Sequence, residues 1–136
     1  MMKLELNELP TLCGIIAQRL PEGGIVVLQG DLASGKTTLT QAFATYLGLK
    51  GAVTSPTFSL QQRYGETLYH YDLYNYGLEK FLSLGMLEEF EKSGYHLVEW
   101  GDEALIGWLK RCGFAAVIVT ITKCDERSRC YEVQDA

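Results

Sequence analysis

The stretch Gly30-Asp31-Leu32-Ala33-Ser34-Gly35-Lys36-Thr37 matches every fixed position of the pattern G-x-x-x-x-G-K-[ST], which is typical of a phosphate-binding P-loop. Gly30 and Gly35 allow backbone angles and a close approach that a Cβ atom would block. The backbone N–H groups of such a loop point inward and form a concave anion site. Lys36 is expected to reach the β- and γ-phosphates of a nucleotide, and the Thr37 hydroxyl to bind Mg²⁺.

The sequence on either side of this loop has the pattern that a P-loop requires. Residues 24–29 form a short apolar, β-branched run, which predicts a buried parallel strand. In residues 37–47, apolar side chains recur at helical spacing, and Gly48 follows as the expected C-cap. Strand, glycine-rich loop and helix therefore occur in the order that the motif needs.

Further elements are expected along the rest of the chain. A helix is predicted through Leu9 and Leu20, a hairpin from strands 59–64 and 67–72, and two short helices within 78–92, broken near Gly85. Strands are predicted at 95–100, 114–122 and 130–134, with a helix from 102 to 109 capped by Asp102. This order predicts an α/β fold with a mostly parallel sheet and antiparallel hairpin additions. We expect one domain, residues 1–136.

Composition and charge narrow the class of protein. With 47% hydrophobic and 21% charged residues, the 136-residue chain is typical of a globular protein. Its net charge of −5 argues against unaided binding of nucleic acid, because neutralising phosphates dominates that affinity. No apolar run approaches the ~20 residues of a membrane span, and the N-terminus has no apolar signal region. A cytoplasmic location is expected.

Several side chains are expected to be structural. The four cysteines form no C-x-x-C pair and have no histidine at zinc-ligand spacing, so reduced thiols are expected, although Cys124 and Cys130 could face each other across a hairpin. Glu88, Glu89 and Glu91 are expected on a solvated face. His70 and His96 lie in predicted strands, where structural roles are more common than catalytic ones.

Two carboxylates are the candidates for work on a bound nucleotide. Asp72 ends the run Leu68–Asp72, and Glu99 ends the run Leu97–Glu99. Ligands collect at the carboxyl ends of strands in parallel sheets, so either acid could hold Mg²⁺ and the other could orient the attacking water. The alternative for Asp72 is an N-cap, and for Glu99 a strand-end carboxylate facing solvent.

Two more residues are candidates near the nucleotide. Thr57, in Ser55-Pro56-Thr57, follows the predicted P-loop helix where a γ-phosphate-sensing loop is expected. A proline turn with a capping threonine is the alternative. Trp100 is a candidate to stack on a base or to shield the site, and equally a core indole. Asp31 is expected to be a turn residue.

Four segments together resemble the TsaE (YjeE-type) family. They are Gly30–Thr37, Ser55-Pro56-Thr57-Phe58, His70-Tyr71-Asp72-Leu73-Tyr74 and Val98-Glu99-Trp100, in the order and spacing of that family. The P-loop is common to many ATPases, but the combination is much more specific. Two departures stand out: Ala33-Ser34 replaces the family's usual Gly-Ala, and Asn75 stands where the family usually has arginine.

The resemblance implies a small bacterial ATPase with a P-loop NTPase-like three-layer fold, active in the formation of threonylcarbamoyladenosine (t6A) in tRNA. It implies ATP and Mg²⁺ as cofactors, TsaD-like and TsaB-like protein partners, and only indirect contact with tRNA. Thr37, Asp72 and Glu99 would bind the metal ion, and Asp72 and Glu99 would also act on the attacking water. Thr57 would supply the switch hydroxyl. The nucleotide would contact Gly30, Asp31, Leu32, Ala33, Ser34, Gly35, Lys36, Thr37, Thr38 and Trp100.

Three other functions stay open on the sequence. Thr122-Lys123-Cys124-Asp125 matches the [NT]-K-x-D guanine-recognition pattern of GTPases, with a plain hairpin turn as the favoured interpretation. A small-molecule kinase would need several clustered arginines, and the five here do not cluster in a lid-like segment. A nucleotide-gated adaptor would bind ATP and dock a partner, with hydrolysis incidental.

Overall fold

The structure, a computed structural model, describes residues 2–30, 36–49, 53–54, 61–73 and 78–136. The N-terminal half contains β1 (Met2–Glu5), η1 (Leu6–Glu8), α1 (Leu9–Arg19), β2 (Gly23–Gln29), α2 (Lys36–Tyr46), β3 (Val53–Thr54) and β4 (Gln61–Tyr64). The C-terminal half contains β5 (Leu68–Asp72), α3 (Leu78–Ser83), α4 (Met86–Phe90), β6 (Gly94–Glu99), α5 (Glu103–Cys112), β7 (Ala116–Lys123) and β8 (Ser128–Asp135).

Strand β2 lies at the centre of the fold because both of its faces are apolar. Val26 and Leu28 belong to one hydrophobic core, and Ile25 and Val27 to the other. Successive side chains of a strand point to opposite faces, so a continuous apolar run buries both faces of the sheet. β2 pairs in parallel with β6 on one side and with β7 on the other. The buried parallel strand predicted before the glycine-rich loop is confirmed.

Within the described residues, the sheet has eight strands in the order β1-β8-β7-β2-β6-β5-β4-β3. The four central strands, β7, β2, β6 and β5, run parallel. The outer pairs, β7 with β8, β8 with β1, β5 with β4 and β4 with β3, are antiparallel. The predicted α/β class, with a parallel centre and antiparallel hairpin additions, is confirmed.

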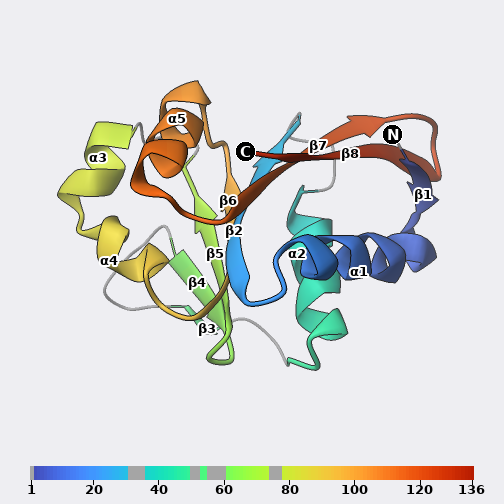
Figure 1. The fold of residues 1–136 in the computed structure, drawn as a ribbon. Helices are drawn as coiled ribbons and strands as arrows, with labels where there is room; N and C mark the ends of the chain where they lie inside the picture. The colour runs from blue at the N-terminus through green and yellow to red at the C-terminus, as the bar shows by residue number, and fades with distance from the viewer. Residues whose placement is uncertain (1, 31–35, 50–52, 55–60, 74–77) are drawn as a thin grey trace.

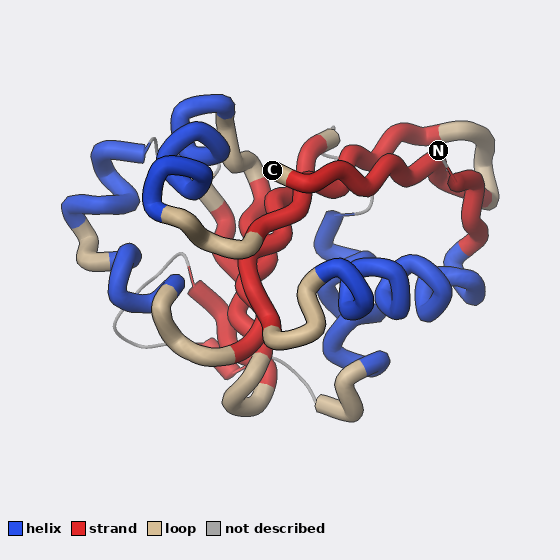
Figure 2. Tube along the Cα trace, in the orientation of Figure 1, coloured by secondary structure: helices blue, strands red, loops and turns tan. Residues whose placement is uncertain are grey.

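Helices cover both faces of this sheet, which gives the expected three layers (Figure 1, Figure 2). Helices α1 and α2 pack on one face through Leu12, Ile16, Leu39 and Phe43. Helices α3, α4 and α5 cover the other face. None of the helices in the described ranges is long and apolar enough to cross a membrane.

The boundaries of helices α3, α4 and α5 lie at turn and capping residues. The two short helices α3 and α4 are separated at Gly85, whose φ of 78° lies in the left-handed region. Asp102 caps α5, because its carboxylate accepts a hydrogen bond of 2.9 Å from the backbone N–H of Leu105. Both features were predicted from the sequence.

Two structural expectations are wrong. Glu88 and Glu91 are exposed as predicted, but Glu89 is buried, because Gln61 and Lys92 donate hydrogen bonds to its carboxylate. Cys124 and Cys130 form a disulfide rather than two reduced thiols. The β7–β8 hairpin places their Cα atoms 5.8 Å apart, inside the range of about 4.4–6.8 Å that a disulfide spans. Cys13 and Cys112 are free thiols, as expected.

Gly94 shows how closely the strands approach at the amino end of the parallel sheet. Its φ is +123°, and a Cβ at this position would lie 2.3 Å from the carbonyl oxygen of Thr67. Gly94→Ala is therefore expected to lower the free energy of unfolding by at least about 2 kcal/mol, because backbone strain and overpacking each cost 1–3 kcal/mol. Urea denaturation of the purified variant measures this change.

Gly107→Ala is the matched control for that substitution. Gly107 lies inside α5, where the nearest atom to an added Cβ is the flexible Arg111 guanidinium at 3.4 Å. This control is expected to be neutral or to stabilise by up to about 1 kcal/mol, since alanine is the better helix former. Equal losses in both variants would contradict the steric explanation.

Candidate functional site

The glycine-rich motif lies between a parallel strand and a helix. Gly30, with φ 146°, follows β2, and α2 begins at Lys36. Asp31, Leu32, Ala33, Ser34 and Gly35 lie outside the described residues, and so does Thr57. Lys36 and Thr37 open α2, but their side chains are not among those described, whereas the side chain of Thr38 is exposed. The strand expected before the motif and the helix expected after it are confirmed.

The two candidate carboxylates end neighbouring strands. Asp72 is the last residue of β5 and Glu99 the last residue of β6, and the parallel register pairs them with each other. Glu99 is also paired with Leu28 of β2, two residues before Gly30. Both acids therefore lie at the same edge of the sheet as the glycine-rich loop.

Both carboxylates also lie on the face of the sheet that α2 covers. Leu97 and Leu68 belong to the core beneath α1 and α2, and side chains two residues apart on a strand share a face. Glu99 follows Leu97 by two residues, and Asp72 follows Leu68 by four. Asp72 is exposed, whereas Glu99 is only 6% exposed. One acid therefore faces solvent and the other is held inside.

His70 contacts the buried acid directly. Its Nε2 atom lies against a carboxylate oxygen, Oε2, of Glu99, and both side chains are buried. A histidine nitrogen bound to a carboxylate fixes the orientation of that carboxylate. His70, expected only to be structural, therefore positions the Glu99 carboxylate. The available signal was the spacing His70-x-Asp72, which puts both side chains on one face of a strand.

Trp100 follows Glu99 in an uncommon backbone conformation. Its φ of 64° lies in the left-handed region, which bulky residues rarely adopt. The indole is half-buried and packs against the core beneath α3, α4 and α5. Backbone strain of this kind is concentrated at functional sites, and here it occurs next to a candidate catalytic acid. Its contact with a nucleotide stays a prediction.

Comparison with known proteins identifies the family. A family model described as "Threonylcarbamoyl adenosine biosynthesis protein TsaE" matches residues 5–130. The chain belongs to the TsaE family. Its family is therefore one of tRNA t6A biosynthesis, in agreement with the resemblance of the four sequence segments.

Individual members of the TsaE family align over much of the chain. The tRNA threonylcarbamoyladenosine biosynthesis protein TsaE of Treponema pallidum is 42% identical over 91 residues, which cover 65% of this chain and 67% of that protein. The protein of the same name from Bacillus subtilis is 36% identical over 126 residues, covering 79% of each. The crystal structure of Bacillus subtilis YdiB matches 99% of this chain and 84% of its own, with a TM-score of 0.65 and 27% identity.

A pocket of about 690 Å³ adjoins the start of α2 in this TsaE-family chain. Thr38 lines it from α2, and Leu6 and Asn7 line it from the N-terminal segment. Glu126, Arg127 and Arg129 close it from the β7–β8 hairpin. The sequence did not reveal this pocket, because its walls come from segments about a whole chain length apart.

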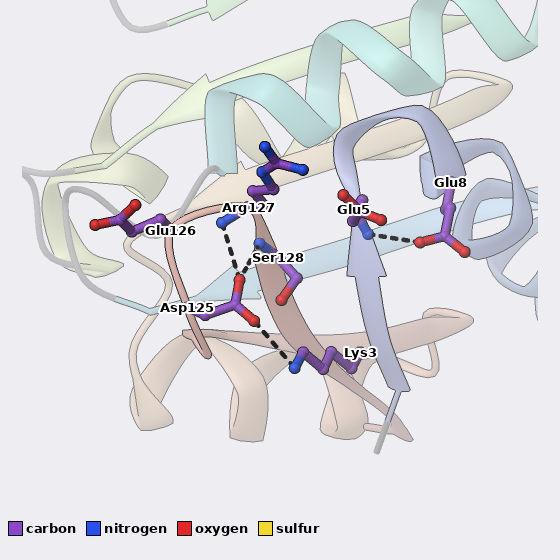
Figure 3. Close-up of a pocket in the computed structure, with 7 residues that line it drawn as sticks. All are labelled: Lys3, Glu5, Glu8, Asp125, Glu126, Arg127 and Ser128. Carbon is purple, nitrogen blue, oxygen red and sulfur yellow. Dashed lines mark hydrogen bonds and ion pairs between the residues drawn. The ribbon is translucent and has the colours of Figure 1, made fainter.

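The Thr122–Asp125 pattern spans the end of β7 and the start of the β7–β8 turn, as the favoured interpretation of a hairpin turn predicts. The Asp125 carboxylate accepts hydrogen bonds from the backbone N–H groups of Arg127 at 2.9 Å and Ser128 at 2.8 Å (Figure 3). Its other oxygen pairs with the Lys3 ammonium at 3.0 Å. These partners, Lys3 first, lower the pKa of Asp125. The carboxylate thus stabilises the turn.

A buried polar network lies on the opposite face of the sheet. His96 Nε2 donates to the carbonyl oxygen of Lys92 at 2.8 Å, so the neutral ring accepts a hydrogen bond at Nδ1 from the Tyr71 hydroxyl, also at 2.8 Å. Gln61 Nε2 donates to the Tyr71 oxygen and to Glu89. Burial raises the pKa of Glu89, but hydrogen bonds from Lys92 and Gln61 outweigh this effect and lower it.

This network predicts a pH dependence of stability. Burial lowers the pKa of His96 below 6.5, and it outweighs the Lys92 carbonyl and the Glu89 charge, which raise the pKa. The Lys92 ammonium lowers it further. The unfolded chain therefore binds the proton first, so the stability from neutral His96 is full above pH 6.5 and is lost as pH falls below it.

The variant His96→Gln tests this linkage. Urea denaturation between neutral pH and pH 5 is expected to show a falling free energy of unfolding in the parent, with a slope of up to about 1.4 kcal/mol per pH unit for one proton. The glutamine variant is expected to be less stable throughout but to lack that contribution to the slope. Identical slopes in the two proteins would assign the titration to another group.

Proposed function

We propose that this chain binds ATP and Mg²⁺ at the carboxyl end of β2 and hydrolyses ATP to support threonylcarbamoyl transfer to an adenosine of tRNA. One observation carries the proposal: Asp72 and Glu99 end neighbouring strands at the edge of the sheet where β2 ends, on the face that α2 covers. Such a pair is what nucleotide hydrolysis requires next to a P-loop.

The candidate residues carry the oxygen ligands that Mg²⁺ requires. Carboxylate and hydroxyl oxygens are the ligands that Mg²⁺ prefers, and Thr37, Asp72 and Glu99 supply them. When bound, Mg²⁺ would neutralise charge on the phosphates. The exposed Asp72 is suited to hold the hydrated ion. The buried Glu99, oriented by His70, is suited to orient the attacking water.

The remaining residues of the proposal have binding roles. Lys36 would pair with the phosphates, and Thr57 would sense the γ-phosphate. The pocket beside Thr38 has the place and size to take the nucleoside part. Trp100 would limit access of water to the acids. We further propose a cytoplasmic location, protein partners resembling TsaD and TsaB, and no direct contact with tRNA. The net charge of −5 supports the last point.

Reconstitution tests this function. The purified chain is added to the TsaD- and TsaB-like transferase core with tRNA, threonylcarbamoyl-adenylate, ATP and Mg²⁺, and modified adenosines are counted per complex. Repeated turnover is expected only when the chain and ATP are both present. The same count without the chain would reject the proposal.

Competition between ATP and GTP distinguishes the proposed ATPase function from the GTPase alternative. The turn role of Asp125 supports ATP, so Asp125→Ala is expected to leave nucleotide preference unchanged. Tight binding of GTP alone, abolished by Asp125→Ala, would favour a GTPase. Phosphorylation of a metabolite without partner proteins would instead favour a kinase.

A further inference from the structure

We propose that Cys124 and Cys130 form a reversible thiol–disulfide pair that adjusts the affinity of the pocket beside Thr38 for nucleotide. The inference rests on the proposed function, because it assigns regulation to the same site. The structure joins the two sulfurs across the β7–β8 hairpin, with six residues of sequence separation. Cys124 follows β7 directly, and Cys130 lies in β8.

The bridge is accessible to exchange. Cys124 is exposed and Cys130 is half-buried, so a dissolved thiolate can reach the Cys124 sulfur. Cys13 differs, because it is buried and burial raises the pKa of its thiol to about 11, which keeps it protonated and unreactive. Among the cysteines, only Cys124 and Cys130 therefore combine access with a bonded partner.

The bridge closes a segment that forms one wall of the pocket. Residues 125–129 lie between the two cysteines, and Glu126, Arg127 and Arg129 line the pocket opposite Leu6 and Thr38. Thr38 is the third residue of α2, the helix that the glycine-rich loop leads into. A change in the mobility of the bridged segment is therefore transmitted directly to the candidate nucleotide site.

Non-covalent contacts hold the same segment, so the disulfide acts as a second restraint. Asp125 binds two backbone N–H groups of its own turn and the Lys3 ammonium of β1 (Figure 3). These contacts keep the hairpin folded when the bridge opens. The bridge further restricts the motion of residues 125–129, which form this wall of the pocket. A wall that is fixed before binding loses less conformational entropy when the ligand binds. The disulfide form is expected to bind nucleotide more tightly.

A dithiol reductant opens the disulfide in two thiol–disulfide exchange steps. A thiolate of the dithiol attacks Cys124 Sγ, the Cys124–Cys130 bond breaks, and Cys130 leaves as a thiolate that takes up a proton. The second thiol of the reductant then displaces Cys124, so the reductant is oxidised to a disulfide while two protein thiols form. Oxidation by a disulfide oxidant reverses both steps, with two electrons and two protons transferred.

The test compares one protein in two redox states. The full chain carrying Cys112→Ser, which removes the exposed free thiol outside the bridge, is equilibrated with reduced or oxidised dithiothreitol. Thiols are counted by alkylation and mass spectrometry, and ATP affinity is measured with Mg²⁺ present. The disulfide form is expected to bind ATP about fivefold or more tightly, at the lower end of usual coupling between sites. Cys124→Ser in the same background is expected to bind as the reduced form does in both buffers.

The possible outcomes distinguish failure of the redox inference from failure of the proposed function. Equal ATP affinity in both states, with the bridge forming as described, would overturn the inference and leave the proposed function intact. Failure of the two cysteines to oxidise would overturn the inference in the same way. If the chain bound ATP in neither redox state, the proposed function would be overturned and, with it, the nucleotide-linked role of the bridge.

Discussion

Replacing Lys36 with alanine is expected to remove measurable ATP binding. Lys36 is the lysine of the Gly30–Thr37 motif and the first residue of α2, where backbone N–H groups at a helix N-terminus already favour an anion. A lysine–phosphate contact is charge-assisted, and truncating one partner of a buried charge pair costs 2–5 kcal/mol or more. A loss of affinity of about thirtyfold to several thousandfold or more follows. Isothermal titration calorimetry with ATP and Mg²⁺ measures it.

Lys110→Ala is the control for this experiment. Lys110 is an exposed lysine in the last turn of α5, so the variant loses the same charge at a distance from the loop after β2. Its ATP affinity is expected to match that of the parent, and thermal unfolding checks that both variants are folded. Unchanged ATP affinity in Lys36→Ala would place the nucleotide elsewhere.

The sequence predicted most of what lies around the glycine-rich loop, because there local pattern and global fold agree. A continuous apolar run such as residues 24–29 can only be satisfied by burial on both faces, and the loop and helix after it are encoded by neighbouring residues. The strand ends at Asp72 and Glu99 were also accessible, since each ends an apolar run. The rule that ligands collect at strand ends in such sheets led to the expectation that both acids lie at one edge, but it did not predict that these two strands are adjacent.

Contacts between distant residues were not accessible in this way. The buried carboxylate of Glu89 accepts a hydrogen bond from Gln61, and Nδ1 of His96 accepts one from the Tyr71 hydroxyl, so each contact needs an element far away in sequence. Sheet register decides the contact of His96 with Tyr71, and the packing of α4 against the sheet decides the contact of Glu89 with Gln61. One sequence reveals neither for elements so far apart in the chain. A charged residue on a short helix therefore predicts exposure unless its partner is known.

The disulfide was missed for a different reason. Its expected absence came from the compartment, since thiols are usually reduced in the cytoplasm. The geometry of a β-hairpin is a separate constraint, and it brings Cys124 and Cys130 within bonding distance whatever the compartment. Which form predominates is then a matter of redox conditions, and the spacing of the two cysteines along the hairpin was the signal for a bond.

Glu99→Gln is expected to separate ATP binding from ATP hydrolysis. The amide keeps the size of the side chain and can still bond to His70, so β6 and its neighbours are expected to keep their packing. The amide cannot accept a proton from water, however, and general acid–base groups contribute about 10²- to 10⁴-fold to a rate. The hydrolysis rate constant is expected to fall by that factor, while ATP affinity changes only a few-fold. Phosphate release under saturating ATP measures the rate.

Glu103→Gln controls for loss of a negative charge nearby, because Glu103 is exposed at the start of α5 and is expected to leave hydrolysis unchanged. The same Glu99 variant then decides whether hydrolysis is needed for repeated rounds of tRNA modification. If Glu99→Gln binds ATP, hydrolyses it slowly and stops turnover, hydrolysis is part of the function. If it supports full turnover, the chain acts as a nucleotide-gated adaptor, and bound ATP itself, held between the glycine-rich loop and the two strand-end acids, is the signal.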